Sequence, residues 1–495
     1  MAFFKIHPSD NVVVEGHDKF AAQDIKKGAE IVKYGFPIGI AATDIKKGEH
    51  VHTHNVLSAL EGKTGYAPYH PFTGKTGHAP YRPFAGKTGY APYHPFTGKT
   101  REASSLPFAG KTPSGGGTFR GYRRKDGRAG IRNDVFILPT VGCINGICEK
   151  LARETGAIAL THPFGCSQLG GDHESTRRIL AGLACHPNAG GVLVLSLGCE
   201  NNTPESFRAL LEERGADFDR LRFLTVQKSA DEIAEGKALL AELFARAAKE
   251  EREEIPLSEL VVGLKCGGSD GLSGVTANPL VGRVCDRVVD CGGAAVLSEI
   301  PECFGAEDIL LGRCASEEIY DKLAKTIDNF KAYYRAHGER IDENPSPGNK
   351  AGGITTLAEK SLGCVQKGGS SAVRDVLGYG ERVREKGLSV LNGPGNDIVA
   401  CTAMMAAGAH LILFTTGRGT PLGCGVPVLK ISSNSELAAA KPGWIDFDAG
   451  TLLAGDSDAQ EKLFALVLRV AGGEKTKNEK MGYHEIAIWK DGVTL

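Results

Sequence analysis

The sequence has no excess of charge of either sign, because 58 basic residues are balanced by 59 acidic ones over a length of 495 residues. Such a balance gives no indication of a nucleic-acid partner or of an anionic membrane surface. The chain also lacks any run of 18 apolar residues, so we expect no membrane span. The first residues, MAFFKIHPSDN, contain no long apolar segment, so we expect no secretory signal and a cytoplasmic location.

The cysteines lack the spacings of zinc and redox motifs. None of the 13 cysteines forms a CxxC pair, and an odd number in so long a chain argues against a disulfide framework. We expect reduced thiols, most of them buried as small apolar residues. Four cysteines instead lie beside glycines at the ends of predicted strands, namely Cys143, Cys166, Cys199 and Cys266.

The sequence also lacks a dinucleotide-binding motif and has few aromatic residues, and both features limit the classes of enzyme that fit it. No GxGxxG motif opens a predicted helix, which argues against a nicotinamide-dependent dehydrogenase. Aromatic residues make up only 7% of the chain, whereas glycine is abundant, with 65 residues. This composition suits an enzyme with many tight loops between strands and helices.

From residue 119 onward, apolar strands alternate with helices, which predicts α/β domains with largely parallel sheets. A long charged helix that ends before Pro256 indicates a boundary between one domain at 118–255 and a second at 256–495, which carries most of the candidate loops. The helices expected in the second of these domains cover residues 279–291, 305–336, 371–386, 396–408 and 458–472.

Residues 1–60 are predicted to form a small β-rich module, in which the turn sequence DIKKG occurs twice. The module ends in the segment from His50 to Asn55, HVHTHN. Because alternate residues of a strand face the same way, His50, His52 and His54 can converge on a metal ion. We assign His52 and His54 as candidate metal ligands, with a solvated strand end as the alternative.

Residues 61–117 are predicted to be a linker that contains a tandem repeat of period twelve. Its copies read GKTGYAPYHPFT, GKTGHAPYRPFA, GKTGYAPYHPFT and a degraded GKTREASSLPFA. The prolines remove hydrogen-bond donors and the glycines add chain entropy, so neither a helix nor a central strand fits. The GKT triplets lack the strand and helix that flank a phosphate-binding loop, so we expect no phosphate site there.

The stretch from Leu264 to Pro279, LKCGGSDGLSGVTANP, is the main candidate for the active site. It follows a predicted strand and precedes a predicted helix, which is where open α/β sheets place ligands. Its glycines let the backbone approach a ligand, and Asp270 offers a carboxylate that can act as a base or as a metal ligand. Thr276 and Asn278 supply a hydroxyl and an amide for a substrate.

Three other loops supply further candidate residues. Arg418 in TTGRGTP suits a bidentate contact with a substrate carboxylate, and Thr420 follows two residues later. Asn349 and Lys350 in SPGNK can hold substrate hydroxyls or polarise a carboxylate, with a plain loop turn as an equal alternative. His162, near the Cys166 loop, can supply a catalytic acid or base.

These loops resemble those of the altronate dehydratase family of sugar-acid dehydratases, which also includes galactarate dehydratase. The resemblance covers the chain except residues 61–117, and HVHTHN and LGCENN look like the altronate branch. Two features depart from the family pattern: the module is short between DNVVV and GHDKF, and the repeat enlarges a plainer linker. The motifs that carry the resemblance are KYGFPIG, HVHTHN, RNDVFILPTVGCING, FGCSQLGGDH, HPNAG, LGCENN, CGGSDGLSGVTANP, NPSPGNKAGGITTL, GPGND, TTGRGTP and WIDFDAG.

The resemblance implies a β-clip-like, SAF-like N-terminal module and a lyase that removes water from a sugar acid. It implies conversion of D-altronate to 2-dehydro-3-deoxy-D-gluconate, with galactarate or another aldarate as the alternative substrate. It also implies a divalent metal, Fe2+ or Mn2+, and we expect a homo-oligomer, a dimer, whose only other partner is its small-molecule substrate.

Two alternatives stay open from the sequence. The four strand-end cysteines can ligate iron, even as an iron–sulfur cluster, but without a compact cysteine motif a single cation bound by oxygen and imidazole is favoured. A carbohydrate-binding scaffold that uses the repeat as its surface is the non-enzymatic alternative. The many polar strand-end loops argue against that scaffold.

Overall fold

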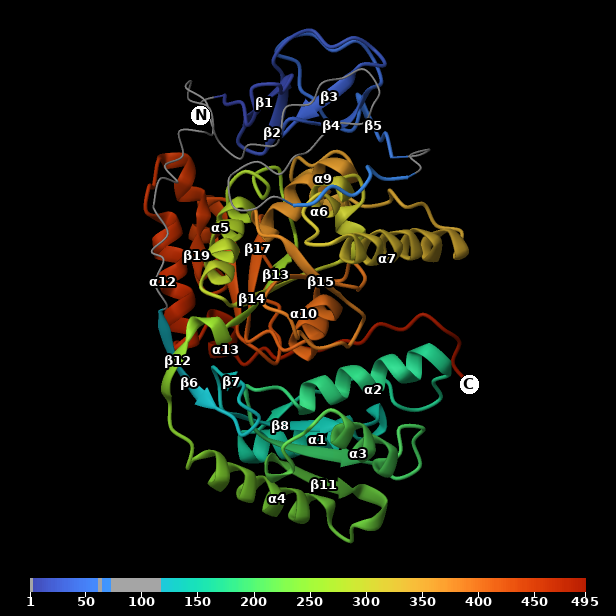
Figure 1. The fold of residues 1–495 in the computed structure, drawn as a ribbon, viewed down its shortest axis with the longest axis vertical. Helices are drawn as coiled ribbons and strands as arrows, with labels where there is room; N and C mark the ends of the chain where they lie inside the picture. The colour runs from blue at the N-terminus through green and yellow to red at the C-terminus, as the bar shows by residue number, and fades with distance from the viewer. Residues whose placement is uncertain (1–2, 61–64, 73–116) are drawn as a thin grey trace.

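A computed structural model of the chain describes residues 3–60, 65–72 and 117–495, and it confirms the expected fold class. Figure 1 shows a small strand module at one end of the molecule, the C-terminal α/β domain in the middle and the other α/β domain at the far end. Most of the twelve-residue repeat, from residue 73 to residue 112, lies outside the described residues. A linker there stays a prediction.

The N-terminal module consists of two small antiparallel sheets, with strand orders β1-β2 and β3-β4-β5. Alternate side chains of its strands are buried, as expected for half-buried sheets. The two DIKKG turns pair with each other, since Ile25 and Ile45 exchange two backbone hydrogen bonds of 2.8 Å. The strands are β1 (Val12–Glu15), β2 (Asp18–Ala21), β3 (Glu30–Lys33), β4 (Phe36–Ala41) and β5 (Val56–Leu57).

The middle part of the chain forms a four-stranded sheet with the order β11-β10-β8-β9, in which every pair is parallel. Its central strand β10 is buried along its whole length, as its continuous apolar run predicts. The strands are β8 (Asp134–Pro139), β9 (Ile158–Ala159), β10 (Ala189–Ser196) and β11 (Leu221–Thr225). The helices are α1 (Asn145–Thr155), α2 (Gly170–Ala184), α3 (Pro204–Glu213) and α4 (Glu232–Ala247).

The C-terminal part forms a seven-stranded parallel sheet with the order β15-β16-β14-β13-β17-β18-β19. The central strand β13 carries the glycine-rich loop at its carboxyl end, so this loop lies among the ends of its neighbours. The strands are β13 (Val261–Cys266), β14 (Ala294–Ser298), β15 (Val373–Leu377), β16 (Gly387–Leu391), β17 (Leu411–Thr416), β18 (Val428–Ser432) and β19 (Phe447–Asp448).

The helices around this sheet agree with the prediction in three places and differ in two. α5, α10 and α12 lie within two residues of the expected ranges, whereas the helix expected at 305–336 is divided into α6 and α7. The helix expected at 371–386 is wrong, because this segment contains β15, an edge strand that pairs with β16. The helices are α5 (Ala277–Asp290), α6 (Glu307–Leu311), α7 (Glu317–Ala336), α8 (Pro347–Ala351), α9 (Leu357–Cys364), α10 (Asp397–Ala406), α11 (Ser435–Ala440), α12 (Ala459–Ala471) and α13 (Lys477–Met481).

The two α/β domains are joined by a small antiparallel sheet and by one cluster of buried apolar side chains. The chain enters the middle domain through β6 (Thr118–Arg123) and leaves it through β12 (Glu253–Pro256), and these strands pair in an antiparallel sheet with β7 (Ala129–Gly130). One cluster of buried apolar side chains runs from Phe136 of the middle sheet to Phe414 of the C-terminal sheet. The two sheets therefore hold fixed positions relative to each other.

The first copy of the repeat is partly described and packs on α7. The hydroxyl of Tyr66 donates to Asp328 at 2.6 Å, and the ring of Tyr69 lies 5.9 Å from that of Tyr320. Repeat tyrosines can therefore dock on the protein itself. Within 3–60, 65–72 and 117–495, no helix combines the length and the apolar character needed to cross a bilayer.

Candidate active site between the N-terminal module and the C-terminal sheet

The residue that the N-terminal module brings to the glycine-rich loop is His17. Its Nδ1 lies 3.0 Å from a carboxylate oxygen of Asp270, and the two side chains are 37% and 1% exposed. A half-exposed imidazole thus rests on a buried carboxylate. In such a pair the carboxylate holds one ring nitrogen and leaves the other, Nε2, to exchange a proton with a ligand.

Two glycines make room for this pair. Gly353 has a positive φ of 94°, and a Cβ at this position would overlap the carbonyl oxygen of His17, so the turn between β1 and β2 rests directly on its backbone. A Cβ at Gly417 would overlap the carboxylate of Asp270. The motifs that contain these glycines are therefore required for the close approach of His17 and Asp270.

Asp270 is held by hydroxyls and an amide from two loops. Its carboxylate accepts hydrogen bonds from Ser273 at 2.8 Å, from Ser433 at 2.8 and 2.9 Å, and from the amide of Asn434 at 3.1 Å. Burial opposes ionisation, but the contact with His17 and these hydrogen bonds outweigh it and hold the pKa of Asp270 below its usual value. In turn, the hydrogen bond with Asp270 raises the pKa of His17.

A buried ion cluster docks the module onto the C-terminal domain. Lys19 and Lys33 reach the same oxygen of Glu359 on α9, at 3.0 and 2.7 Å, and all three side chains are at most 1% exposed. Glu359 also accepts from the backbone and hydroxyl of Thr355, at 2.9 and 2.6 Å. Despite burial, the two ammonium groups lower the pKa of Glu359 to about 2, so the carboxylate stays charged. Lys19 lies two residues after His17, so the cluster fixes the position of His17.

Two basic residues that the sequence singles out, Arg418 and Lys350, lie beside this site. The backbone N–H of Arg418 donates to the carbonyl of Gly268 at 2.8 Å, which places the residue beside the Asp270 loop, and its side chain is exposed. The backbone carbonyl oxygen of Lys350 lies 2.9 Å from Nε2 of His52. Neither the Arg418 guanidinium nor the Lys350 ammonium has an ion-pair partner among the described residues. Both are available to an anionic ligand.

Four other predicted substrate contacts are engaged inside the protein. Asn349 accepts from the backbone of Ser346, the N-cap of α8, and donates to the carbonyl of Ser269 at 2.8 Å, and Thr420 accepts from the backbone of Leu422. The hydroxyl of Thr276 donates to the carbonyl of Ser433 at 2.6 Å. The amide of Asn278 donates to Gly363, and its oxygen accepts from Thr415 at 2.5 Å. Their contact with substrate stays a prediction, whereas their present contacts fix the loops that carry Asp270.

His162 lies apart from this group, in the middle domain. It is 2% exposed, and its Nε2 lies 2.9 Å from the carbonyl of Pro139 at the end of β8. Burial lowers the pKa of His162 to about 4, so the imidazole is neutral. The structure does not bring it together with Asp270, and a catalytic role for His162 remains a prediction.

The rings of the three alternating histidines lie close together, but the strand expected there is wrong, because residues 52–55 form a turn in which the backbone N–H of Asn55 donates to the carbonyl of His52. The ring of His50 is stacked 5.4 Å from that of His52 and lies 6.0 Å from that of His54. However, Nε2 of His50 contacts Asp18 at 3.1 Å, and Nε2 of His52 faces the carbonyl of Lys350. A metal bound by His52 and His54 stays a prediction, and it requires His52 to exchange this partner.

A buried group of three other residues can hold a metal ion. Ligand atoms of Cys266 at the end of β13, Glu302 after β14 and Cys364 at the end of α9 all lie within 4.8 Å of one another. The two sulfurs are 3.2 Å apart. Contact with Cys364, together with the nearby ammonium groups, lowers the pKa of Cys266 to about 6 against the effect of burial. The nearby ammonium groups therefore favour the thiolate of Cys266, the form that binds metals.

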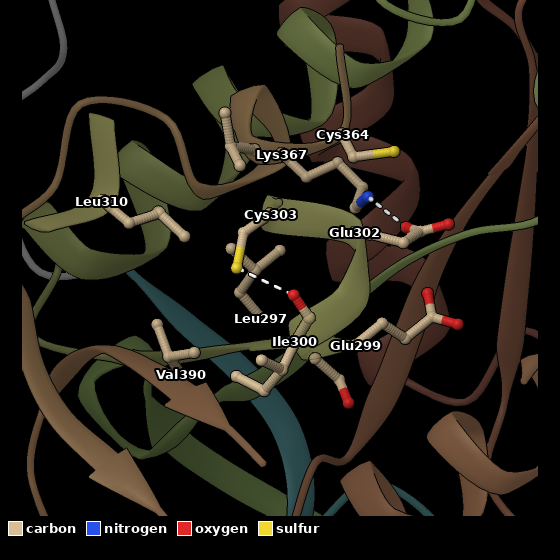
Figure 2. Close-up of a pocket in the computed structure, with 11 residues that line it drawn as sticks. Leu297, Glu299, Ile300, Glu302, Cys303, Leu310, Cys364, Lys367 and Val390 are labelled. Carbon is tan, nitrogen blue, oxygen red and sulfur yellow. Dashed lines mark hydrogen bonds and ion pairs between the residues drawn. The ribbon is translucent and has the colours of Figure 1, made fainter. Parts of the chain in front are cut away.

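Ammonium groups surround the same donors. The Nζ of Lys367 lies 2.8 Å from the sulfur of Cys266 and 3.8 Å from Glu302, and Lys360 lies 3.0 Å from Glu302. Figure 2 shows Lys367 extending toward Glu302 in a cavity that these two residues line together with Glu299, Cys303 and Cys364. The donor set suits a thiophilic divalent ion. Its binding requires the contact between Lys367 and Cys266 to open.

The four strand-end cysteines fall into two places. Cys266 is buried in the C-terminal domain beside Cys364, whereas Cys143, Cys166 and Cys199 are exposed in the middle domain. They therefore do not form one set of ligands. The domain boundary predicted at residue 255 already separates Cys266 from the other three cysteines.

Sequence reasoning missed His17, Ser433 and Asn434. His17 lies in a turn between two short strands, where its neighbours Gly16 and Asp18 carry no catalytic pattern. Ser433 and Asn434 follow β18 directly, so the strand-end rule that led to Asp270 and Arg418 could have found them. No rule applied to the sequence could have found the long-range contact of His17.

Known proteins are similar to this chain over its full length. Family models match three successive segments: residues 13–59 match the altronate/galactarate dehydratase SAF domain, residues 121–248 the second domain of D-galactarate dehydratase/altronate hydrolase, and residues 257–494 the C-terminal domain of D-galactarate/altronate dehydratase. The chain is 46% identical to an altronate dehydratase of Bacillus subtilis and 44% identical to one of Escherichia coli, each over the full length of both proteins. It is 32% identical to the L-threo-forming galactarate dehydratase of Escherichia coli, over 98% of this chain and 96% of that protein.

Proposed function

The chain belongs to the D-galactarate/altronate dehydratase family, and from this premise we propose that it is a hydro-lyase that converts D-altronate to 2-dehydro-3-deoxy-D-gluconate. The full-length identity of 46% and 44% to two altronate dehydratases carries the choice of substrate. Galactarate is the second candidate, because a galactarate dehydratase is 32% identical. We further propose a cytoplasmic homodimer.

The chemistry of the reaction defines what the site must supply. The proton on C2 leaves first, and it is weakly acidic because it lies next to an ionised carboxylate. The hydroxyl on C3 then departs as water, and the resulting enol becomes the 2-keto acid. A base at C2, an acid at the C3 hydroxyl and a positive charge at the carboxylate are therefore required.

His17 and Asp270 suit the base at C2. The carboxylate lies 3.0 Å from Nδ1 of the imidazole, so Nε2 is the atom that can accept the proton. The positive charge that then develops on His17 is stabilised by the adjacent Asp270, whose ionised state is favoured by Ser273 and Ser433. Asp270 acts through His17 in this arrangement, as a positioning group.

Arg418 suits the carboxylate of the substrate, and Lys350 suits its C3 hydroxyl. A guanidinium binds a carboxylate through two parallel hydrogen bonds, which fixes the orientation of C2 relative to His17. The Lys350 ammonium is a proton donor for the C3 hydroxyl as it leaves. Both cations border the Asp270 loop and have no ion-pair partner among the described residues, which supports these roles.

We propose iron(II), or else manganese(II), as the assisting metal. When bound, a divalent ion stabilises the negative charge of the enediolate as a Lewis acid. The group of Cys266, Glu302 and Cys364 supplies fitting donors, and its two sulfurs favour iron(II) over manganese(II). Cys266 precedes Asp270 by four residues on one loop, so this group and the His17 pair belong to the same sheet edge.

A panel of substrates tests the function. Purified protein with D-altronate should release a 2-keto-3-deoxy acid with a kcat/KM in the ordinary enzymatic range, about 10⁴ M⁻¹s⁻¹ or more. Galactarate and other aldarates should react at least tenfold more slowly, and a chelator should remove activity that iron(II) restores. Equal rates with galactarate would favour the second candidate, absence of turnover with every acid would refute the lyase, and full activity of metal-free protein would refute metal assistance.

Arg418→Lys tests the carboxylate contact. Lysine keeps the charge but loses the bidentate geometry, and one charge-assisted contact is worth about 1.5–3 kcal/mol, so kcat/KM should fall roughly tenfold to a hundredfold. Because the contact also orients C2, kcat should fall as well as KM rise. Steady-state kinetics with D-altronate measure both values.

The control for this variant is Arg469→Lys, which alters an exposed arginine of α12 that pairs with Glu474. Its kinetics should stay unchanged. A purely structural role for Arg418, such as an ion pair with Asp448, predicts a lower melting temperature with normal kinetics. Asp448 instead accepts from the backbone of Gly450 at 2.8 Å, so we expect an unchanged melting temperature for Arg418→Lys.

A further inference from the structure

The middle domain exposes three thiols that the proposed reaction does not use. Ten of the 13 cysteines are buried or half-buried, and the three exposed ones are Cys143, Cys166 and Cys199. Each follows a strand of the same parallel sheet, at its carboxyl end, and β10, β8 and β9 are neighbours in that sheet. Ligands of open α/β sheets bind at this edge.

Hydrogen bonds join the three loops beside each cysteine. The backbone of Gly142 donates to the carbonyl of Phe164 at 2.8 Å, which links the residue before Cys143 to a residue two before Cys166. The backbone of Ser167, the residue after Cys166, donates to the side chain of Asn201 at 2.8 Å, two residues after Cys199. Glu200 and Thr140 close the set through a hydrogen bond of 2.5 Å. The three loops that carry the thiols are therefore joined to one another at one edge of the sheet.

The same loops contain buried polar atoms that lack partners. Asn202 is 0% exposed, yet neither its amide nitrogen nor its oxygen has a hydrogen-bond partner within the described part of the chain. The amide nitrogen of Gln168, a residue 3% exposed, is in the same state. Buried polar groups are rarely left unsatisfied, so two such residues in the loops that carry the three thiols point to a bound group.

The spacing of the thiols favours a large group over a single ion. Within the described residues, the donors that lie within 4.8 Å of one another in groups of three are those of the Cys266 group, and the three exposed thiols are not among them. One tetrahedral ion with metal–sulfur bonds of about 2.3 Å would hold its sulfurs closer together than this limit. A cluster of several irons spreads its thiolate ligands farther apart.

We propose that Cys143, Cys166 and Cys199 bind a [4Fe–4S] cluster through three of its irons. The fourth iron has no cysteine and keeps a position for an oxygen ligand, such as water or a hydroxy acid. Binding of a preassembled cluster is a ligand exchange: three thiols lose their protons, three thiolates replace the ligands of the carrier, and no electrons move. The unpartnered polar side chains of Asn202 and Gln168, which belong to the same loops, would then supply hydrogen bonds to the cluster or to its oxygen ligand.

The test uses the full chain purified without oxygen, followed by incubation with a synthetic [4Fe–4S] cluster held by small thiolates. After desalting, the protein should retain about four irons and four acid-labile sulfides per chain, with the broad visible absorption of iron–sulfur charge transfer. The triple variant Cys143→Ser, Cys166→Ser, Cys199→Ser should retain neither iron nor sulfide from the cluster. These readouts do not depend on dehydratase activity, so they separate this proposal from the proposed function.

The matched control is Cys291→Ser, which alters a half-buried cysteine at the end of α5 in the other α/β domain. It should take up the cluster as the wild type does. Protein that retains no sulfide, iron without sulfide, or equal uptake by the triple variant would each overturn the proposal. Iron without sulfide would indicate a single ion, and its loss in Cys266→Ser would assign that ion to the buried group.

Discussion

Replacement of His17 by alanine should lower kcat by about 10²–10⁴, the range that a positioned acid or base contributes to catalysis. Nδ1 of the imidazole lies 3.0 Å from the carboxylate of Asp270, and its Nε2 does not face that carboxylate. Its removal should leave the fold intact, because the module is docked by Lys19, Lys33 and Glu359 rather than by His17. Turnover of D-altronate and thermal melting measure the two effects.

The pH profile distinguishes a base from a structural histidine. Asp270, then Asp18 and Glu436, raise the pKa of His17 above 6.5, and burial opposes them. If neutral His17 takes the proton, kcat/KM falls as the pH falls through a value above 6.5. Asp270→Asn removes the main cause, so the acid limb should move to lower pH. A limb that stays in place in Asp270→Asn would exclude His17 as the group that titrates.

His7→Ala is the matched control, since it removes a histidine of the same module whose Nδ1 faces Ser9 at 2.7 Å. The His7 ring packs beside Gly35, whereas the ring of His17 lies against Asp270, so kcat should change by about twofold or less even if the module loses some stability. Equal loss of kcat in His7→Ala and His17→Ala would mean that the module, rather than the His17 imidazole, sets the rate.

The class of fold could be predicted because its signals are local. Strand β10 reads as a continuous apolar run, and alternation with helices implies a parallel sheet. The error at 371–386 has a physical cause. Val373, Val376 and Leu377 have the spacing i, i+3 and i+4 of a helix face, and β15 forms only because β16 offers an edge to pair with. Such pairing depends on residues that lie far away in the chain.

Part of the site could also be predicted, because the end of a buried strand is a local feature of the sequence. Asp270 and Arg418 follow buried strands, and the carboxyl ends of neighbouring strands meet at one edge. Their partner His17 comes from 253 residues before Asp270 in a module that docks from above the sheet, and no local pattern marks it. His162 satisfies the same strand-end rule as Asp270 but belongs to the sheet of the other domain, and no local pattern shows whether the loops of the two domains meet at one site.

Glu359→Gln should give the largest loss of stability, about 3–5 kcal/mol, because breaking a buried ion pair leaves an uncompensated buried charge. Lys19 and Lys33 are fully buried and share one oxygen of Glu359, so the substitution deprives two ammonium groups of the same partner. The module should detach or lose its register, which moves His17 away from Asp270. Activity should therefore fall together with the free energy of unfolding, measured by denaturant titration.

Glu461→Gln is the control, since it breaks an ion pair with Arg287 in which the carboxylate is 60% exposed, and exposed pairs contribute only about 0–1 kcal/mol. The pH dependence provides a second check. The pKa of Glu359 is depressed to about 2, so its stabilisation is complete above its unfolded pKa near 4.5 and disappears as the pH falls toward 2. The stability difference between the wild type and Glu359→Gln should shrink over that interval. A constant difference across it would mean that the carboxylate charge is not what holds the module, and that the loss of activity needs another cause.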